Sequence, residues 1–170
     1  EANVQFDGAI LAGGQGTRMA GLANALPKAL LPVGNEPLIS HHLSMMRAMG
    51  IQNVSIVIGH LGNRIADYVG DGSRWGVRAR LIEQRNPLGT AHAALLLEEA
   101  VTRNFVLVMG DVYFEIEDAE ALLEPVRTGA ADGVLGAKWE SDEALIHRNF
   151  AIFTGPDGAV RKVVEKPLYD

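Results

Sequence analysis

The chain has 170 residues, 48% of them hydrophobic and 21% charged, which is typical of one globular domain with an apolar core. Its formal net charge of −6 argues against a nucleic-acid partner, because neutralising a phosphate backbone needs a surplus of Lys and Arg. There is no cysteine, no signal-peptide pattern and no run near the roughly 18 apolar residues that span a bilayer, so we expect a cytoplasmic protein without disulfides, thiolate zinc sites or a membrane partner.

Apolar runs alternate with helical patterns along the first part of the chain. Residues 8–12 predict a buried strand that ends in glycines. Residues 37–50 predict an amphipathic helix, because apolar side chains recur at spacings of four and three between Pro37 and Gly50. The alternation continues with strands at 54–58, 77–82 and 105–109 and helices at 63–69, 90–100 and 118–123. We therefore predict an α/β fold with a mostly parallel sheet.

The last part of the chain has a different pattern. An apolar run at 133–137 is followed by two runs that the turn residues 155–158 separate, which predicts an antiparallel hairpin near the C-terminus. No linker or internal repeat interrupts the chain, so we expect one domain over residues 1–170.

A glycine-rich segment follows the first strand. Gly13, Gly14 and Gly16 are three glycines within four positions, and without a Cβ their backbone N–H groups can surround phosphate oxygens. Arg18 and Lys28 would neutralise the phosphate charge. Taken alone, the segment fits an ordinary glycine-rich turn equally well.

Two familiar phosphate-binding motifs differ from this segment in detail. A P-loop is excluded, because Gly16 is followed by Thr17 and Arg18 instead of Lys. A dinucleotide-binding fingerprint is the weaker hypothesis, since prolines interrupt the helix that should follow it. A dehydrogenase stays open mainly through Glu36, which lies where a ribose-binding acid is expected.

Four motifs in order make a family resemblance specific. Residues 11–19, with Pro27-Lys28 beyond them, are similar to the signature of the sugar-1-phosphate nucleotidyltransferases, also called nucleotide-sugar pyrophosphorylases. Residues 84–93 resemble the base-binding segment of this family, Gly110-Asp111 its metal-binding aspartate, and residues 165–167 its sugar-phosphate motif. The four motifs cover nearly the whole chain. The resemblance implies a Rossmann-like α/β/α sandwich.

The resemblance also implies a reaction, in which NMP passes from an NTP to a sugar 1-phosphate, pyrophosphate is released and an NDP-sugar forms. It assigns Arg18, Lys28 and Asp111 to catalysis, Asp111 also to Mg²⁺, and Glu165 and Lys166 to the sugar phosphate. Nucleotide binding is assigned to ten residues, namely Leu11, Ala12, Gly13, Gly14, Gly16, Thr17, Arg18, Gln84, Gly89 and Thr90. A non-catalytic binding or regulatory module of the same fold is the alternative, and a homo-oligomer is possible.

The nucleotide base is predicted from Gln84. Its amide offers an acceptor and donors that match the N3–H and O4 edge of uracil or thymine, so UTP or dTTP is favoured, with GTP possible. The sugar is not identified, because residues 148–151 depart from the Tyr-Gly pair that the family has before its hairpin. Family members continue to a second metal-binding Asp, so we expect the domain to be truncated after Asp170.

The histidines do not predict a zinc site. His41 and His42 are adjacent on the predicted helix and point apart, so we interpret them as packing or surface residues. His60 and His147 have no partner at ligand spacing, and His92 is interpreted as a helix-face residue in the base-binding segment.

Overall fold

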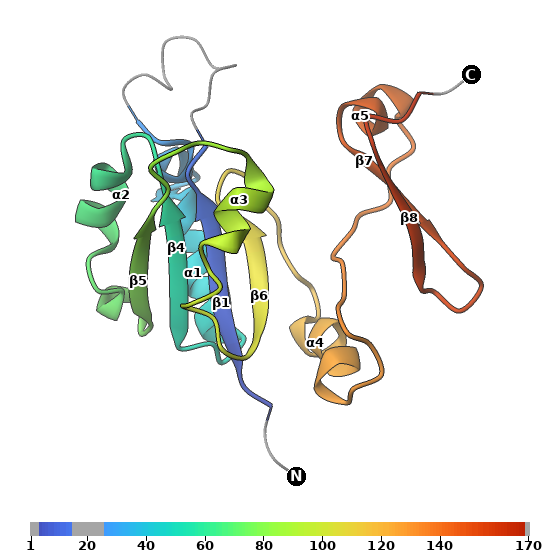
Figure 1. Ribbon diagram of the computed structural model, residues 1–170, viewed down its shortest axis with the longest axis horizontal. Helices are drawn as coiled ribbons and strands as arrows, with labels where there is room; N and C mark the ends of the chain where they lie inside the picture. Colours follow the sequence, from blue (N-terminus) through green and yellow to red (C-terminus); the bar gives the residue numbers. More distant parts are fainter. Residues whose placement is uncertain (1–3, 15–25, 169–170) are drawn as a thin grey trace. The chain divides into compact units, whose positions relative to one another are not determined.

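The computed structural model describes residues 4–14 and 26–168 (Figure 1). The chain forms two compact units that divide after Gly133, and each is considered by itself. The expected single domain over residues 1–170 stays a prediction.

The first unit is built on a parallel sheet of four strands in the order β5-β4-β1-β6. The strands are β1 (Phe6–Ala12), β4 (Asn53–Ile58), β5 (Arg78–Glu83) and β6 (Asn104–Met109). All of β1 is buried, which explains why its sequence is a nearly continuous apolar run. The chain runs from β1 to β4 and β5 and then returns to β6 on the other side of β1, so the strand order reverses between β1 and β6.

Helices cover both faces of this sheet, with α1 (Leu38–Ala48) and α2 (Gly62–Val69) on one face and α3 (Thr90–Leu95) on the other (Figure 1). The first unit is therefore an α/β/α sandwich, as predicted. Gly8 lets α1 approach β1 closely, because a Cβ at this position would overlap the sulfur of Met46.

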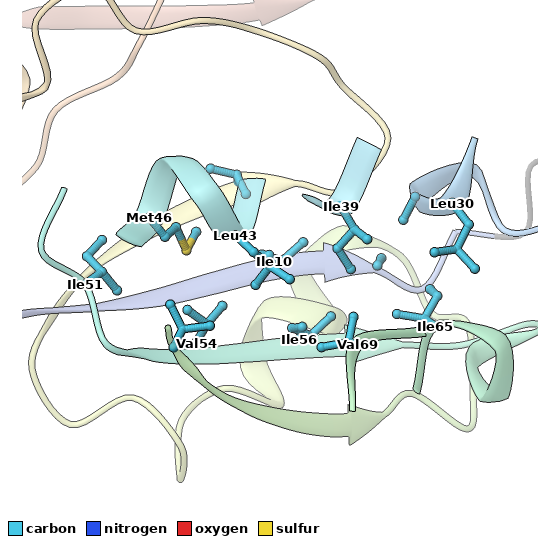
Figure 2. Packing of buried hydrophobic residues seen from close by; sticks show 14 of the residues in the cluster. Ile10, Leu30, Ile39, Leu43, Met46, Ile51, Val54, Ile56, Ile65 and Val69 are labelled. Carbon is cyan, nitrogen blue, oxygen red and sulfur yellow. The ribbon is translucent and has the colours of Figure 1, made fainter. Parts of the chain in front are cut away.

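The larger apolar core lies between the sheet and α1 with α2. Figure 2 shows Ile10 and Ile56 of the sheet beside Ile39, Leu43 and Met46 of α1, and all five side chains are fully buried. A smaller cluster on the opposite face consists of Ala9, Leu11, Val57, Ala93 and Leu97. Burial of apolar surface on both faces of β1 holds the layers together.

Shorter elements complete the first unit. They are η1 (Lys28–Leu30), β2 (Pro32–Val33), β3 (Glu36–Pro37), η2 (Ser73–Trp75) and α4 (Ala119–Arg127). β2 and β3 form a small antiparallel pair, and Asp118 caps α4 by accepting a hydrogen bond from the backbone N–H of Ala121 at 2.9 Å.

The four predicted strands of the sheet and the predicted helices before residue 90 are confirmed, with ends shifted by at most a few residues. The helix predicted over residues 90–100 is wrong in extent, because α3 ends at Leu95. Beyond it, the N–H groups of Leu97 and Glu98 bond to carbonyls three residues back, so tight turns carry Leu97 into the smaller core. Residues 133–137 form no strand.

The second unit contains α5 (Glu143–Arg148) and an antiparallel hairpin of β7 (Phe150–Thr154) and β8 (Val160–Glu165). The hairpin predicted around residues 155–158 is therefore confirmed. Gly158 has a φ of +77°, a conformation that glycine adopts without strain.

None of the helices in residues 4–14 and 26–168 combines the length and the apolar character that crossing a membrane requires.

His42 is a buried polar residue of the first unit. It lies on α1 against Phe114, with ring centroids 5.6 Å apart, and within the described residues its Nε2 has no hydrogen-bond partner. Burial, and secondarily the neighbouring charge of His41, lowers the pKa of His42 from 6.5 to about 4. The folded protein therefore keeps this side chain neutral at pH values where a free histidine is protonated.

We expect this residue to make the free energy of unfolding fall with decreasing pH. Between pH 6.5 and 4 this histidine is protonated in the unfolded chain and neutral in the folded protein. The free energy of unfolding should therefore fall by about 2 kcal/mol from about pH 7.5 to about pH 5. Urea unfolding at the two pH values measures it. His42→Leu should remove this part of the pH dependence, whereas His60→Gln, which removes an exposed histidine, should retain it. An unchanged pH dependence in His42→Leu would contradict the assignment.

Candidate active site

A pocket of about 340 Å³ lies in the first unit at the carboxyl ends of its parallel strands. Gly13 and Gly14 follow β1, Gln84 follows β5, and Gly110 and Asp111 follow β6. Ligands of open α/β sheets bind outside the carboxyl ends of the strands where the strand order reverses, which here is between β1 and β6.

Glycines let the strand ends approach one another beside this pocket. A Cβ at Gly59, directly after β4, would lie 2.6 Å from the carbonyl oxygen of Gly13. A Cβ at Gly13 would lie 2.8 Å from Oε1 of Gln84, and one at Gly110 would lie 3.0 Å from the carbonyl oxygen of Leu11. Side chains at these positions would push backbone or buried groups apart, so the wall of the pocket depends on glycine.

Lys28 and Asp111 form an ion pair at the pocket, with Nζ of Lys28 donating to Oδ2 of Asp111 at 3.0 Å. Lys28 begins η1, 83 residues before Asp111, and both side chains are about one third exposed. The pair therefore presents one positive and one negative group to the pocket and to solvent.

The segment after Asp111 packs against α1. The ring of Tyr113 meets that of His41 edge to face, with centroids 5.3 Å apart, and Phe114 lies against His42. His41 also bonds through Nε2 to the carbonyl oxygen of Val33 at 3.0 Å. Both histidines thus pack, as predicted, and they help to hold the segment that carries Asp111.

Gln84 is buried in the wall of the pocket, with 8% of its surface exposed. Its backbone N–H donates to the carbonyl oxygen of Ile58 at 2.8 Å. Its Nε2 lies 3.3 Å from the carbonyl oxygen of Gly89 and 3.1 Å from Nδ1 of His92. The amide is therefore held in one orientation by its neighbours.

The pocket brings together the predicted site residues that the structure describes in the first unit. Nine of them line it, namely Leu11, Ala12, Gly13, Gly14, Lys28, Gln84, Gly89, Thr90 and Asp111. Gly16, Thr17 and Arg18 lie outside the described residues. Glu36, on which the dehydrogenase hypothesis depended, is not among the residues that line this pocket.

The predicted sugar-phosphate residues Glu165 and Lys166 lie in the second unit, at the end of β8. Their side chains are exposed and 3.4 Å apart. Lys166 has a φ of +48°, which is uncommon for a residue with a side chain, and its backbone N–H donates to the carbonyl oxygen of Asn149 at 2.7 Å. That hydrogen bond holds the backbone of the motif in its left-handed conformation.

Two residues of the pocket were missed by the sequence analysis. Ala29 follows Lys28 and is buried, and Met109 ends β6 just before Gly110. The signal for Met109 was its place at the end of a predicted strand. Ala29 carried no signal, because its role depends on where η1 packs.

Among the described residues that line this pocket, Asp111 supplies the one carboxylate that a divalent cation would find there. In residues 4–14 and 26–168 there is no cluster of three or more His, Asp or Glu side chains that could hold a metal ion. One carboxylate suits Mg²⁺ when substrate phosphates and water complete its coordination.

Comparison with known proteins gives the same family as the motifs. Glucose-1-phosphate thymidylyltransferase of Streptomyces griseus is 40% identical over 103 residues, which are 60% of this chain and 29% of the relative. Low-salt glycan biosynthesis nucleotidyltransferase Agl11 of Haloferax volcanii is 34% identical over 163 residues, which are 94% of this chain and 44% of the relative. The chain therefore spans less than half the length of these two curated relatives.

A solved structure has the same fold. It is the crystal structure of a putative glucose-1-phosphate thymidylyltransferase from Bacillus anthracis in complex with a sucrose, with 27% identity and a TM-score of 0.76. The match covers 95% of this chain and 65% of that one. The family model for nucleotidyl transferases matches residues 7–170, so the protein belongs to the nucleotidyl transferase family.

Proposed function

We propose that this protein is a sugar-1-phosphate nucleotidyltransferase, which transfers NMP from an NTP to a sugar 1-phosphate and releases pyrophosphate. The observation that carries the proposal is the pocket at the ends of β1 and β6, where glycine backbone, the Lys28–Asp111 pair and Gln84 lie around one space. The names of the relatives support an enzyme over the alternative of a non-catalytic module. Because NTPs are cytoplasmic substrates, we also propose a cytoplasmic location.

The reaction needs positioning and charge neutralisation more than a covalent nucleophile. A phosphate oxygen of the sugar phosphate attacks the α-phosphorus of the NTP, and the bond from that phosphorus to the oxygen of the leaving pyrophosphate breaks. Backbone N–H groups after β1, at Gly13 and Gly14, would bind the triphosphate. Lys28 and Arg18 would neutralise the departing pyrophosphate. Lys166 and Glu165 would bind and orient the sugar phosphate.

Asp111 fits a magnesium site, because its carboxylate is partly exposed at the pocket and carboxylate oxygen is a ligand that Mg²⁺ prefers. When bound, Mg²⁺ supplies charge stabilisation to the phosphates during the displacement. In the structure Asp111 also accepts a hydrogen bond from Lys28, and this contact holds the Lys28 ammonium beside the pocket.

For the base we expect UTP or dTTP to bind more tightly than GTP or ATP. Gln84 lies in the pocket wall beside Gly89, and its amide carries an acceptor for the N3–H of uracil or thymine. Calorimetric titration of the protein with each NTP and Mg²⁺ measures the preference. A several-fold preference for GTP would overturn the base assignment and leave the transferase proposal standing.

The proposed function is tested by mixing the protein that carries this chain with NTP, Mg²⁺ and a panel of sugar 1-phosphates and measuring pyrophosphate release. We expect release that requires both substrates. An Asp111→Asn variant should bind NTP more weakly in Mg²⁺ and release little pyrophosphate. NTP binding without pyrophosphate release for any sugar phosphate would favour the non-catalytic module instead.

A further inference from the structure

The amide of Gln84 is a buried polar group in the wall of the pocket. Its nitrogen has two neighbours within hydrogen-bond distance, the carbonyl oxygen of Gly89 at 3.3 Å and Nδ1 of His92 at 3.1 Å. Among the described residues no hydrogen bond reaches its Oε1. Within the described residues, the nitrogen of the amide thus has hydrogen-bond neighbours in the protein and the oxygen has none.

The chemistry of the two neighbours decides which end is which. A backbone carbonyl can only accept, so the group that faces Gly89 must be the NH₂ of Gln84. The second proton of that NH₂ then points to Nδ1 of His92, which accepts it when the imidazole is neutral and carries its proton on Nε2. Both N–H donors of the amide are therefore satisfied by groups of the protein.

The acceptor oxygen of the amide remains available to a ligand in the pocket. Oε1 of Gln84 lies against Gly13, 2.8 Å from the place where a Cβ would be, and both residues line the pocket. Because Gly13 has no side chain, a ligand between the end of β1 and the start of α3 would meet this oxygen.

We propose that His92 is a positioning residue, which keeps the acceptor of Gln84 turned toward the base and thereby makes the site select uracil or thymine over cytosine. The inference rests on the proposed function of the pocket. His92 is half-buried on α3 and does not line the pocket, so it acts through Gln84 and does not touch the base.

The selectivity follows from one atom of the base. N3 of uracil and thymine carries a proton and donates to a fixed acceptor, whereas N3 of cytosine is itself an acceptor and would be left facing another. If the amide could turn over, its NH₂ would donate to cytosine N3 and the discrimination would be lost. Two contacts of the amide nitrogen oppose this rotation of the amide. The contact with the carbonyl oxygen of Gly89 is 3.3 Å long, and the contact with Nδ1 of His92 is shorter, at 3.1 Å.

The test compares UTP, CTP and inorganic tripolyphosphate as calorimetric probes in the presence of Mg²⁺. We expect His92→Leu to lower the ratio of UTP to CTP affinity about tenfold, as expected for loss of one buried hydrogen bond, with tripolyphosphate affinity unchanged. His92→Asn should restore most of the ratio, because its Oδ1 can accept near the position of Nδ1. His60→Leu, which removes an exposed histidine outside the pocket lining, is the matched control and should keep the ratio.

Three results would overturn the inference. One is an unchanged UTP to CTP ratio in His92→Leu, and another is a parallel loss of affinity for all three probes, which would mean that His92 only supports the fold. The third is a starting protein that binds UTP no more tightly than CTP. If the starting protein binds neither UTP nor tripolyphosphate, the proposed function fails as well, so the two failures are distinguishable.

Discussion

Replacing Lys28 or Arg18 with alanine is expected to lower kcat by about two orders of magnitude or more, because both cations are assigned to charge that develops in the transition state. For Lys28 the structure supplies a position, since its Nζ lies at the pocket 3.0 Å from Oδ2 of Asp111. The measurement is steady-state pyrophosphate release by the protein that carries this chain, with both substrates saturating. KM is expected to change less than kcat, since the contact strengthens as the pyrophosphate departs.

The matched control is Lys138→Ala, which removes another lysine that is paired with a carboxylate. Lys138 bonds to Glu140 at 2.6 Å, and its side chain is 79% exposed. An exposed pair contributes little, so kcat should stay within about twofold of the starting protein. Equal kcat values for Lys28→Ala and the control would remove Lys28 from the catalytic assignment.

Truncating the centre of the larger core is expected to have the largest effect on stability. Leu43 of α1 is fully buried among Ile10, Ile39 and Met46 (Figure 2), so Leu43→Ala should lower the free energy of unfolding by about 2–5 kcal/mol through lost burial and the cavity left behind. Urea unfolding followed by tryptophan fluorescence measures the loss. Trp139 is fully exposed already, so the signal should report mainly Trp75, which packs against this core.

Leu95→Ala provides the comparison, because it is the same substitution on a helix whose leucine is 63% exposed. Its expected cost is below about 0.5 kcal/mol. If the two variants lost similar stability, the cluster around Leu43 would not be the main source of the stability of the first unit.

The C-terminal end of α3 could not be predicted from the sequence. Residues 90–100 are rich in Ala, Leu and Glu, and their propensity favours helix throughout. In the structure the helix ends at Leu95, because tight turns bring Leu97 against Ala9 and Val57 on the smaller core face. The end of the helix was therefore set by tertiary packing, although the local helix propensity favours a longer helix.

The sequence by itself determined most of the elements and the family. β1 is a nearly continuous apolar run, α1 has apolar side chains at helical spacing, and the β7–β8 hairpin has turn residues between two strand-like runs, so local patterns were enough to predict them. The motifs were likewise readable because each is contiguous along the chain. These features depend on residues that are near one another in sequence.

Tertiary structure alone decided how the site is assembled. Lys28 meets Asp111 across 83 residues, and Gly59 meets Gly13 because β4 pairs beside β1 in one register. The sequence analysis interpreted His92 as a residue on a helix face, and the structure places its ring against the amide of Gln84. Such contacts follow from strand order and register, which depend on the packing of the whole first unit and leave no local pattern in the chain.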